Sequence, residues 1–161
     1  MPTTPADPTA SLKDRLQSDL TEAIRSRNEL HAATLRMALT AVKSEEVSGD
    51  VARTLSDAEV VTVLGREAKK RREAATAFAD AGRAQQAARE QDELGVLESY
   101  LPAQLPDAEL EAIVTAAVAE VTASGASGMA AMGTVMKLVQ PQVAGRAEGG
   151  RVAAEVKRQL A

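Results

Sequence analysis

Apolar side chains recur at helical spacing along almost the whole chain after residue 10. Large apolar residues at every fourth position between 12 and 24 place one apolar stripe on a helix, and Ser11 stands where its N-cap belongs. A second stripe, between residues 35 and 42, follows a short break near Asn28. We therefore expect two antiparallel helices joined by a tight connection.

A third, longer helix is expected after a polar break. Ser56 and Glu59 stand three positions apart in the pattern of a capping box, and the apolar residues that follow fall on one side of a 3.6-residue wheel. Gly82 is the expected stop. A fourth helix, over about 84–101, has to end by Pro102, because the residue before a proline is restricted to extended backbone.

The helical pattern restarts after the second proline of this region, Pro106. Asp107 is the expected N-cap of a helix with a regular apolar stripe between residues 110 and 121, and the glycines and serines of 124–128 predict a turn. A shorter helix with apolar residues between 129 and 139 follows. It is not expected to pass Pro141. A last helix carries Val152, Val156 and Leu160.

These patterns predict an all-α protein, because no segment alternates apolar and polar residues as a strand does. We expect an N-terminal bundle of about four helices and a small three-helix C-terminal domain, separated by the two prolines. The expected division is a flexible tail at 1–10, a helical domain at 11–101 and a small domain at 107–161.

Composition removes several kinds of site. The chain has no Cys, which excludes disulfides, thiolate zinc sites and cysteine nucleophiles, and the single His31 cannot form a histidine metal site by itself. We therefore predict no metal and no cofactor. No stretch approaches the roughly 20 apolar residues of a membrane-spanning helix, and we expect a cytoplasmic protein with no membrane partner.

Charge is distributed unevenly along the third predicted helix. The net charge is −4, so contact with nucleic acid needs a local basic patch. Arg66, Lys69 and Lys70 lie opposite the apolar stripe, whereas Arg71 points into it. A guanidinium on an apolar face requires a partner, and Glu90 or Glu93 could supply one. The exposed cations either form a solvated, ion-paired face or contact phosphate.

The small domain is also polarised. Residues 102–128 carry four acids and no base, whereas 129–161 carry five bases and two acids. Lys137, Arg146 and Arg151 could share one basic patch with the two cations near the C-terminus, although cations at a helix end also stabilise the helix. Arg146 stands in a glycine-flanked loop, where backbone N–H groups can approach an anion.

No self-contained active site is visible, and we predict no catalytic residue. Ser124 and Ser127 have no lysine nearby to activate them, so they fit a turn between helices better than a nucleophile. The chain also lacks a phosphate-binding P-loop and a dinucleotide fingerprint.

Several strings together resemble the YqeY family, over about residues 11–161. The strings are Arg66–Glu73, Ala81–Arg83, Glu93–Leu94, Leu97–Pro102, Met132–Met136 and Val143–Gly149, with Leu35–Met37 and Val42–Ser44 before them. The positions that match the family pattern are Lys69, Arg71, Glu73, Arg83, Glu93, Tyr100, Pro102, Gly133, Met136, Pro141, Gly145 and Arg146. The chain departs from the pattern at Thr134, Gln142 and Ala144, where the family often has lysine, and at Glu148, where aspartate is usual.

The YqeY family is similar to the C-terminal tail region of GatB, a subunit of the tRNA-dependent amidotransferase. This resemblance implies a helical bundle followed by a small three-helix domain, and a role in holding tRNA. A carbon–nitrogen ligase activity with glutamine as amide donor would belong to other parts of such a complex, since none of that machinery is visible here.

We therefore expect a non-catalytic module that contacts tRNA, with amidotransferase subunits as further partners. The alternatives are an adaptor that docks through the Met129, Met132 and Met136 stripe of the small domain, and an accessory factor of an amidotransferase complex. We expect Arg71 and Glu93 to form a structural pair. The predicted RNA-binding residues are Arg66, Lys69, Lys70, Arg83, Lys137, Arg146 and Arg151.

Overall fold

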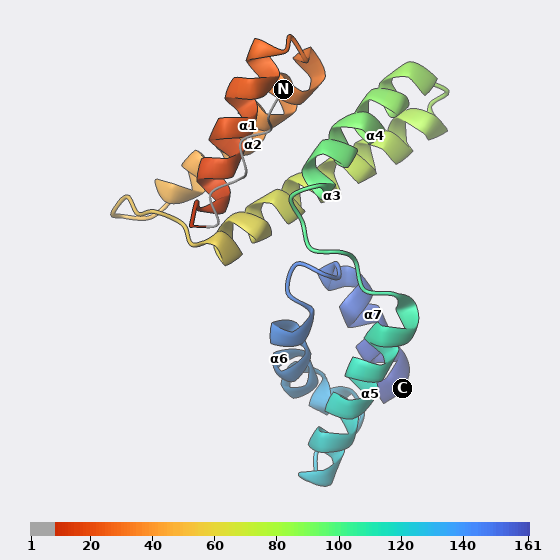
Figure 1. The fold of residues 1–161 in the computed structure, drawn as a ribbon. Helices are drawn as coiled ribbons and strands as arrows, with labels where there is room; N and C mark the ends of the chain where they lie inside the picture. The colour runs from red at the N-terminus through yellow and green to blue at the C-terminus, as the bar shows by residue number, and fades with distance from the viewer. Residues whose placement is uncertain (1–8) are drawn as a thin grey trace. The chain divides into compact units, whose positions relative to one another are not determined.

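The computed structural model describes residues 9–161 and contains α-helices, one short 3-10 helix and no strand in that range (Figure 1). The all-α prediction is confirmed. Most of the predicted flexible tail, residues 1–8, lies outside the described residues. The chain divides into two compact units, of which one ends at Leu101 and the other begins at Pro102.

The first unit consists of two helical hairpins. Its helices are α1 (Leu12–Arg25), α2 (Glu29–Glu46), α3 (Asp57–Asp80) and α4 (Ala84–Glu98). The Ser11 hydroxyl accepts a hydrogen bond from the Asp14 amide, and the Ser56 hydroxyl accepts one from the Glu59 amide, so that capping boxes begin α1 and α3. The two hairpins meet near the start of α3 and diverge toward their tips (Figure 1).

Both hairpin turns end their first helix in the same way. After α3, Gly82 adopts φ 73°, and the Arg83 amide donates to the Phe78 carbonyl over 2.8 Å. After α1, Arg27 takes the corresponding position with φ 58°. This is the Schellman arrangement, in which the left-handed residue is usually glycine. The sequence predicted that Gly82 ends the third helix, but it did not indicate that Arg27 adopts the same left-handed conformation after α1.

Apolar side chains from all four helices form the core of this unit. The largest fully buried ones are Leu16, Leu35, Val42, Val60, Leu64 and Leu97. The predicted stripe of α1 does not stay buried over its full length, because Ile24 is 50% exposed. Ile24 is the penultimate residue of α1, close to the turn that joins α1 to α2.

The second unit is a cluster of three short helices, α5 (Asp107–Ala123), α6 (Met132–Val143) and α7 (Gly149–Leu160). The 3-10 helix η1 (Gly128–Ala131) precedes α6. Valines dominate the core, with Val114, Val135, Val139, Val152 and Val156 almost completely buried. The turn at residues 124–128 contains two glycines with positive φ, as its glycine content predicted.

Three predicted boundaries are wrong. Helix α4 ends at Glu98 and not near 101, because a turn closes over Ser99 and Tyr100 before the proline. Asp107 is the first residue of α5 and not its N-cap, a position that Pro106 occupies without a side-chain hydrogen bond. The Asp107 carboxylate instead accepts a hydrogen bond from Arg151.

Helix α6 also passes Pro141, which was predicted to end it. Pro141 lies inside the helix, two residues before its end at Val143. Pro141 has no N–H to donate to the Lys137 carbonyl, so α6 continues through its last residues with one backbone hydrogen bond fewer. In the same turn, the Gln142 side-chain amide donates to the Leu138 carbonyl over 3.1 Å.

No single helix within residues 9–161 is long and apolar enough to cross a membrane. By length and composition alone, the segments Asp107–Ala123 and Gly128–Val143 pass this test as a pair, with a bend of 104° between them.

Candidate nucleic-acid interface

The first group of predicted RNA-binding residues lies on the exposed face of α3. Arg66, Lys69 and Lys70 are three and four positions apart and therefore share a face. All three side chains are more than half exposed, and each has an acidic neighbour: Nη1 of Arg66 lies 3.3 Å from Glu45, and Nζ of Lys70 lies 2.7 Å from Glu67. Lys69 makes the longest of these pairs, at 3.8 Å. This face is charged but locally balanced.

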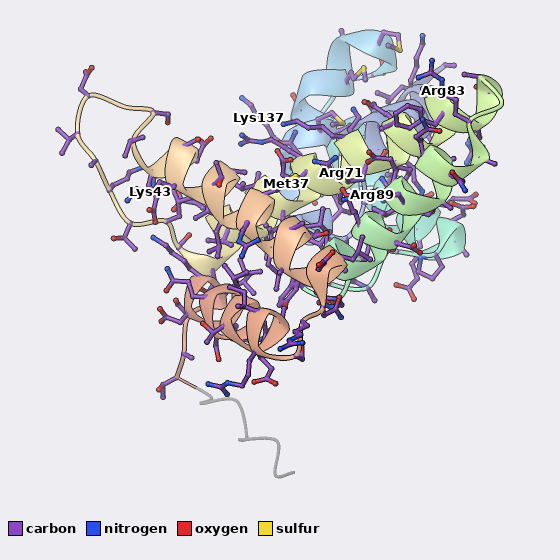
Figure 2. All side chains as sticks on the ribbon, turned by 90° about the horizontal axis from the view of Figure 1, so that it is seen from above. Met37, Lys43, Arg71, Arg83, Arg89 and Lys137 are labelled. Atoms are coloured by element: carbon purple, nitrogen blue, oxygen red, sulfur yellow. The ribbon has the colours of Figure 1, made fainter. Side chains whose placement is uncertain are left out.

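Two predicted residues, Arg83 and Lys137, are exposed and have no acidic partner among residues 9–161. Arg83 is the N-cap residue of α4, and its backbone amide completes the turn after α3. Lys137 stands on the exposed side of α6, opposite the buried Val135 and Val139. Figure 2 shows both side chains, one from each unit.

Arg146 and Arg151 hold the start of the second unit together. The Leu105 amide donates to the Arg146 carbonyl over 2.7 Å, and Nη2 of Arg151 donates to the Leu105 carbonyl, also over 2.7 Å. Arg151 pairs in addition with Asp107 at 2.6 Å, and Arg146 with Glu109 at 3.6 Å. Both arginines therefore bind the segment before α5, a structural role that the sequence did not suggest.

Arg71 lies in a charge network between α3 and α4. Its Nη1 is 3.2 Å from Glu90 and 3.4 Å from Glu93, and Glu93 is also bound by Nε of Arg89 at 3.2 Å. Nη2 of Arg71 approaches the sulfur of Met37 on α2 at 3.6 Å; both residues are labelled in Figure 2. Glu93 is buried, so both of its oxygens need the arginines that contact them.

Sequence reasoning missed several exposed cations of the first unit. Arg27, Arg36 and Lys43 are exposed and form no ion pair with any residue between 9 and 161. Arg36 could have been recognised, because positions 32, 33, 39 and 40 of its own helix carry no acid that could pair with it. Arg27 carries no such signal, since its exposure follows from the turn it occupies.

A family model described as Yqey-like protein matches residues 13–160. The chain belongs to the YqeY family. None of the curated proteins compared with the chain matches it. Membership of this family explains why the sequence strings described above resemble its pattern. These strings lie in both units, and they include the α3 cations and the loop that contains Arg146.

The last helix of this YqeY-family chain contains a second charge cluster. Nη2 of Arg158 lies 2.6 Å from Oε1 of Glu155, and the Gln159 side-chain amide donates to the same oxygen over 2.7 Å. Hydrogen bonds from Arg158 and then Gln159 lower the pKa of Glu155 from 4.5 to about 2. Arg158 is thus paired with an acid of its own helix, whereas the neighbouring Lys157 has no acidic partner in the described part of the chain.

The described residues contain no group of three or more acidic or histidine side chains that could hold a metal ion. The Ser124 hydroxyl donates to the Val121 carbonyl over 2.6 Å, as expected of a helix-end residue and not of an activated nucleophile. What this YqeY-family chain offers chemically is a set of exposed guanidinium and ammonium groups, which can bind anions.

Proposed function

We propose that this YqeY-family chain is a non-catalytic module that contacts RNA, in the first instance tRNA, through the phosphate backbone. The observation that carries the proposal is the pair of exposed cations, Arg83 and Lys137, which no acid of the described chain neutralises. The likeness of the family to the tail region of an amidotransferase subunit supports tRNA as the RNA concerned.

The α3 cations are expected to join these two residues. Ion pairs between exposed side chains stabilise a protein by only about 0–1 kcal/mol, so a phosphate can replace the carboxylate partner of Arg66, Lys69 or Lys70 at little cost. Arg151 is a poorer candidate than the sequence indicated, because withdrawing it would release the Leu105 carbonyl and Asp107. The Arg146 side chain makes only an exposed pair with Glu109 at 3.6 Å, so a phosphate can replace that carboxylate as it can for the α3 cations.

Recognition by shape and charge fits the aromatic content of the chain. A platform for stacking bases needs exposed aromatic rings, and the chain has only Phe78 and Tyr100. The Tyr100 hydroxyl donates to Asp19 over 2.5 Å, and its ring lies beneath the guanidinium of Arg15, 5.7 Å from the ring centroid. Tyr100 is therefore occupied within the first unit, and sequence-specific reading of bases is not expected.

The salt dependence of tRNA binding tests the proposal. Five phosphate contacts predict that log Kd changes with log salt concentration at a slope of about 3.5 to 4.5, because each contact releases condensed counterions. Filter binding or anisotropy titrations with unmodified tRNA between 50 and 200 mM salt, roughly the range over which this term dominates, measure the slope. Affinity that does not respond to salt would contradict the proposal.

A charge-reversal variant tests the named residues. Arg83→Glu combined with Lys137→Glu should weaken tRNA binding by about tenfold or more, since it removes two contacts and adds repulsion. Lys43→Glu combined with Lys157→Glu is the matched control, because it makes the same change in net charge at two other exposed cations without ion pairs, one in each unit. Equal losses in the two double variants would show only a response to overall charge.

The alternative of an adaptor that docks through the methionine stripe has less support. Met132 and Met136 are partly buried and pack against the core of the second unit, and only Met129 is substantially exposed, at 49%. An accessory role in an amidotransferase complex would require co-purification with its subunits and an effect on amide formation. The Arg83 and Lys137 double variant separates these ideas, because it leaves Met129 unchanged.

A further inference from the structure

A groove of about 740 Å³ opens between the tip of the first hairpin and α4. Its walls come from the end of α1, the turn that follows, the first half of α2 and one residue of α4, Arg89. All of the residues that line the groove belong to the first unit. None of the predicted RNA-binding residues lines it.

The groove is strongly basic for a protein of negative net charge. Three arginines line it, Arg27, Arg36 and Arg89, against a single acid, Glu29. Arg27 and Arg36 form no ion pair with any described residue. Arg89 binds Glu93 through Nε, and its side chain is 67% exposed. The groove can therefore present guanidinium groups from three different elements to one anionic ligand.

The backbone of Arg27 supports a role for its side chain. Arg27 occupies a left-handed position with φ 58°, where glycine avoids a steric cost of roughly 1 kcal/mol that other residues incur. The equivalent position of the second hairpin is Gly82. Arg27, which lines the groove, thus adopts a backbone conformation that is unfavourable for arginine. Such strained residues are common at binding sites.

Between the arginines, the wall is aliphatic. Ile24, which is 50% exposed, and Leu30, Ala32 and Ala33 form this apolar part. No aromatic ring is among the residues that line the groove, so it lacks the platform on which bases of single-stranded nucleic acid stack. Aliphatic side chains pack well against the apolar face of an amphipathic helix.

We propose that this groove binds an acidic amphipathic segment of a partner protein, with aliphatic side chains of the segment against Ile24 and Leu30 and its carboxylates paired with Arg27, Arg36 and Arg89. Charge complementarity identifies the partner, since the groove has an excess of guanidinium groups over acids and an apolar wall between them. The contact would let the module join a protein complex while its RNA-binding cations stay free.

A designed peptide tests the inference with the full chain. The probe is a fluorescein-labelled helical peptide of roughly 18 residues, or five turns, with leucines on one face and glutamates beside them. Its partner peptide replaces each glutamate with glutamine. We expect saturable binding of the glutamate peptide by anisotropy at physiological salt, and affinity at least about tenfold weaker for the glutamine peptide.

Arg36→Glu is the decisive variant, because it breaks no ion pair with any residue from 9 to 161 and should not unfold the protein. It should raise the Kd of the glutamate peptide by about tenfold or more. Ile24→Ser should also raise this Kd, through loss of apolar contact. Arg83→Glu is the matched control. It makes the same change in charge in the same unit, and should leave peptide affinity within about twofold while weakening tRNA binding.

Three outcomes would overturn the inference. Equal binding of the glutamate and glutamine peptides would remove the role of charge, and equal losses in Arg36→Glu and Arg83→Glu would show a non-specific response to charge. Absence of peptide binding, together with weakened tRNA binding in Arg36→Glu, would assign the groove to the RNA surface. The RNA proposal is decided separately, by the effect of Arg83→Glu on tRNA.

Discussion

At the residue scale, the acids within reach of each cation decide what it can do. Arg158 is exposed, yet it donates two hydrogen bonds to Glu155, over 3.0 and 2.6 Å, and also approaches Glu111 at 3.4 Å. Lys137 is exposed and approaches no acid in the described chain. Two cations of similar exposure therefore differ in how readily each can bind an external anion.

The Glu155 cluster predicts a specific dependence on pH. Because the folded state lowers the pKa of Glu155 from 4.5 to about 2, it binds the proton less tightly than the unfolded chain does. The contribution of the ionised Glu155 carboxylate to the free energy of unfolding is present in full above about pH 4.5 and is lost as pH falls toward 2. Carboxyl chemical shifts measured by NMR should place the titration of Glu155 near 2.

Two variants check this assignment. Arg158→Ala removes the main cause and should return the pKa of Glu155 toward its ordinary value. Glu155→Gln should flatten the dependence of unfolding free energy on pH over the same range. An unchanged titration in Arg158→Ala would show that the contact between the two side chains does not form in solution.

The sequence could predict only part of the charge arrangement. Glu90 and Glu93, acids of the next helix along the chain, were the candidates for Arg71, and Nη1 of Arg71 lies 3.2 Å from Glu90 and 3.4 Å from Glu93. The partner of Arg66 is Glu45 on another helix, 21 positions away along the chain. Pairs of that kind depend on how helices pack, which side-chain periodicity does not determine.

At the scale of elements, the two hairpins differ in the residue that ends their first helix. Arg27→Gly should raise the free energy of unfolding by up to about 1 kcal/mol, because glycine adopts the left-handed conformation without steric cost. Chemical denaturation followed by circular dichroism measures the change. The steric cost is the upper limit of this gain in stability, because the greater flexibility of glycine in the unfolded chain offsets part of it.

The same variant separates stability from binding. If the Arg27 side chain binds the acidic peptide, Arg27→Gly should stabilise the protein and lower its affinity for that peptide. Such a trade-off between stability and binding is typical of binding sites. Gly82→Ala is the converse control. It places a side chain at φ 73° and should destabilise the second hairpin without affecting peptide binding. A destabilised Arg27→Gly protein would argue that Arg27 makes contacts that outweigh its backbone cost.

Elements with strong local signals were predictable. The serine caps of α1 and α3 and the glycine stop of α3 were identified because each depends on residues close together in the chain. The passage of α6 through Pro141 was not, since the residues beyond the proline bring Val143 into the core of the second unit, a tertiary contact that local sequence signals do not show. The groove was also missed, because its walls come from segments more than 50 positions apart.

At the scale of the whole molecule, each unit has its own core, and we predict that each folds without the other. Val114→Asp would bury a carboxylate in the core of the second unit, where Val114 is completely covered, at a cost of several kcal/mol. This unit is small enough to be lost as a whole. Roughly a third of the helical circular dichroism should then disappear, since helices α5, α6 and α7 contribute that share.

The remaining signal is the informative part of that experiment. The first unit of the Val114→Asp protein should still unfold cooperatively on heating, at the midpoint it has in the unaltered chain. Loss of all helical signal would instead show that the two units depend on each other for stability.

Tyr100 provides an optical label that is confined to the first unit. The only aromatic residues, Phe78 and Tyr100, belong to the first unit, and the chain has no tryptophan to obscure the tyrosine signal. Burial and the hydrogen bond to Asp19 raise the pKa of the Tyr100 phenol, so it keeps its proton and its contact with that carboxylate, a known quencher of tyrosine emission. Tyrosine emission should therefore increase when α1 separates from the turn after α4, and should not change when α5, α6 and α7 unfold.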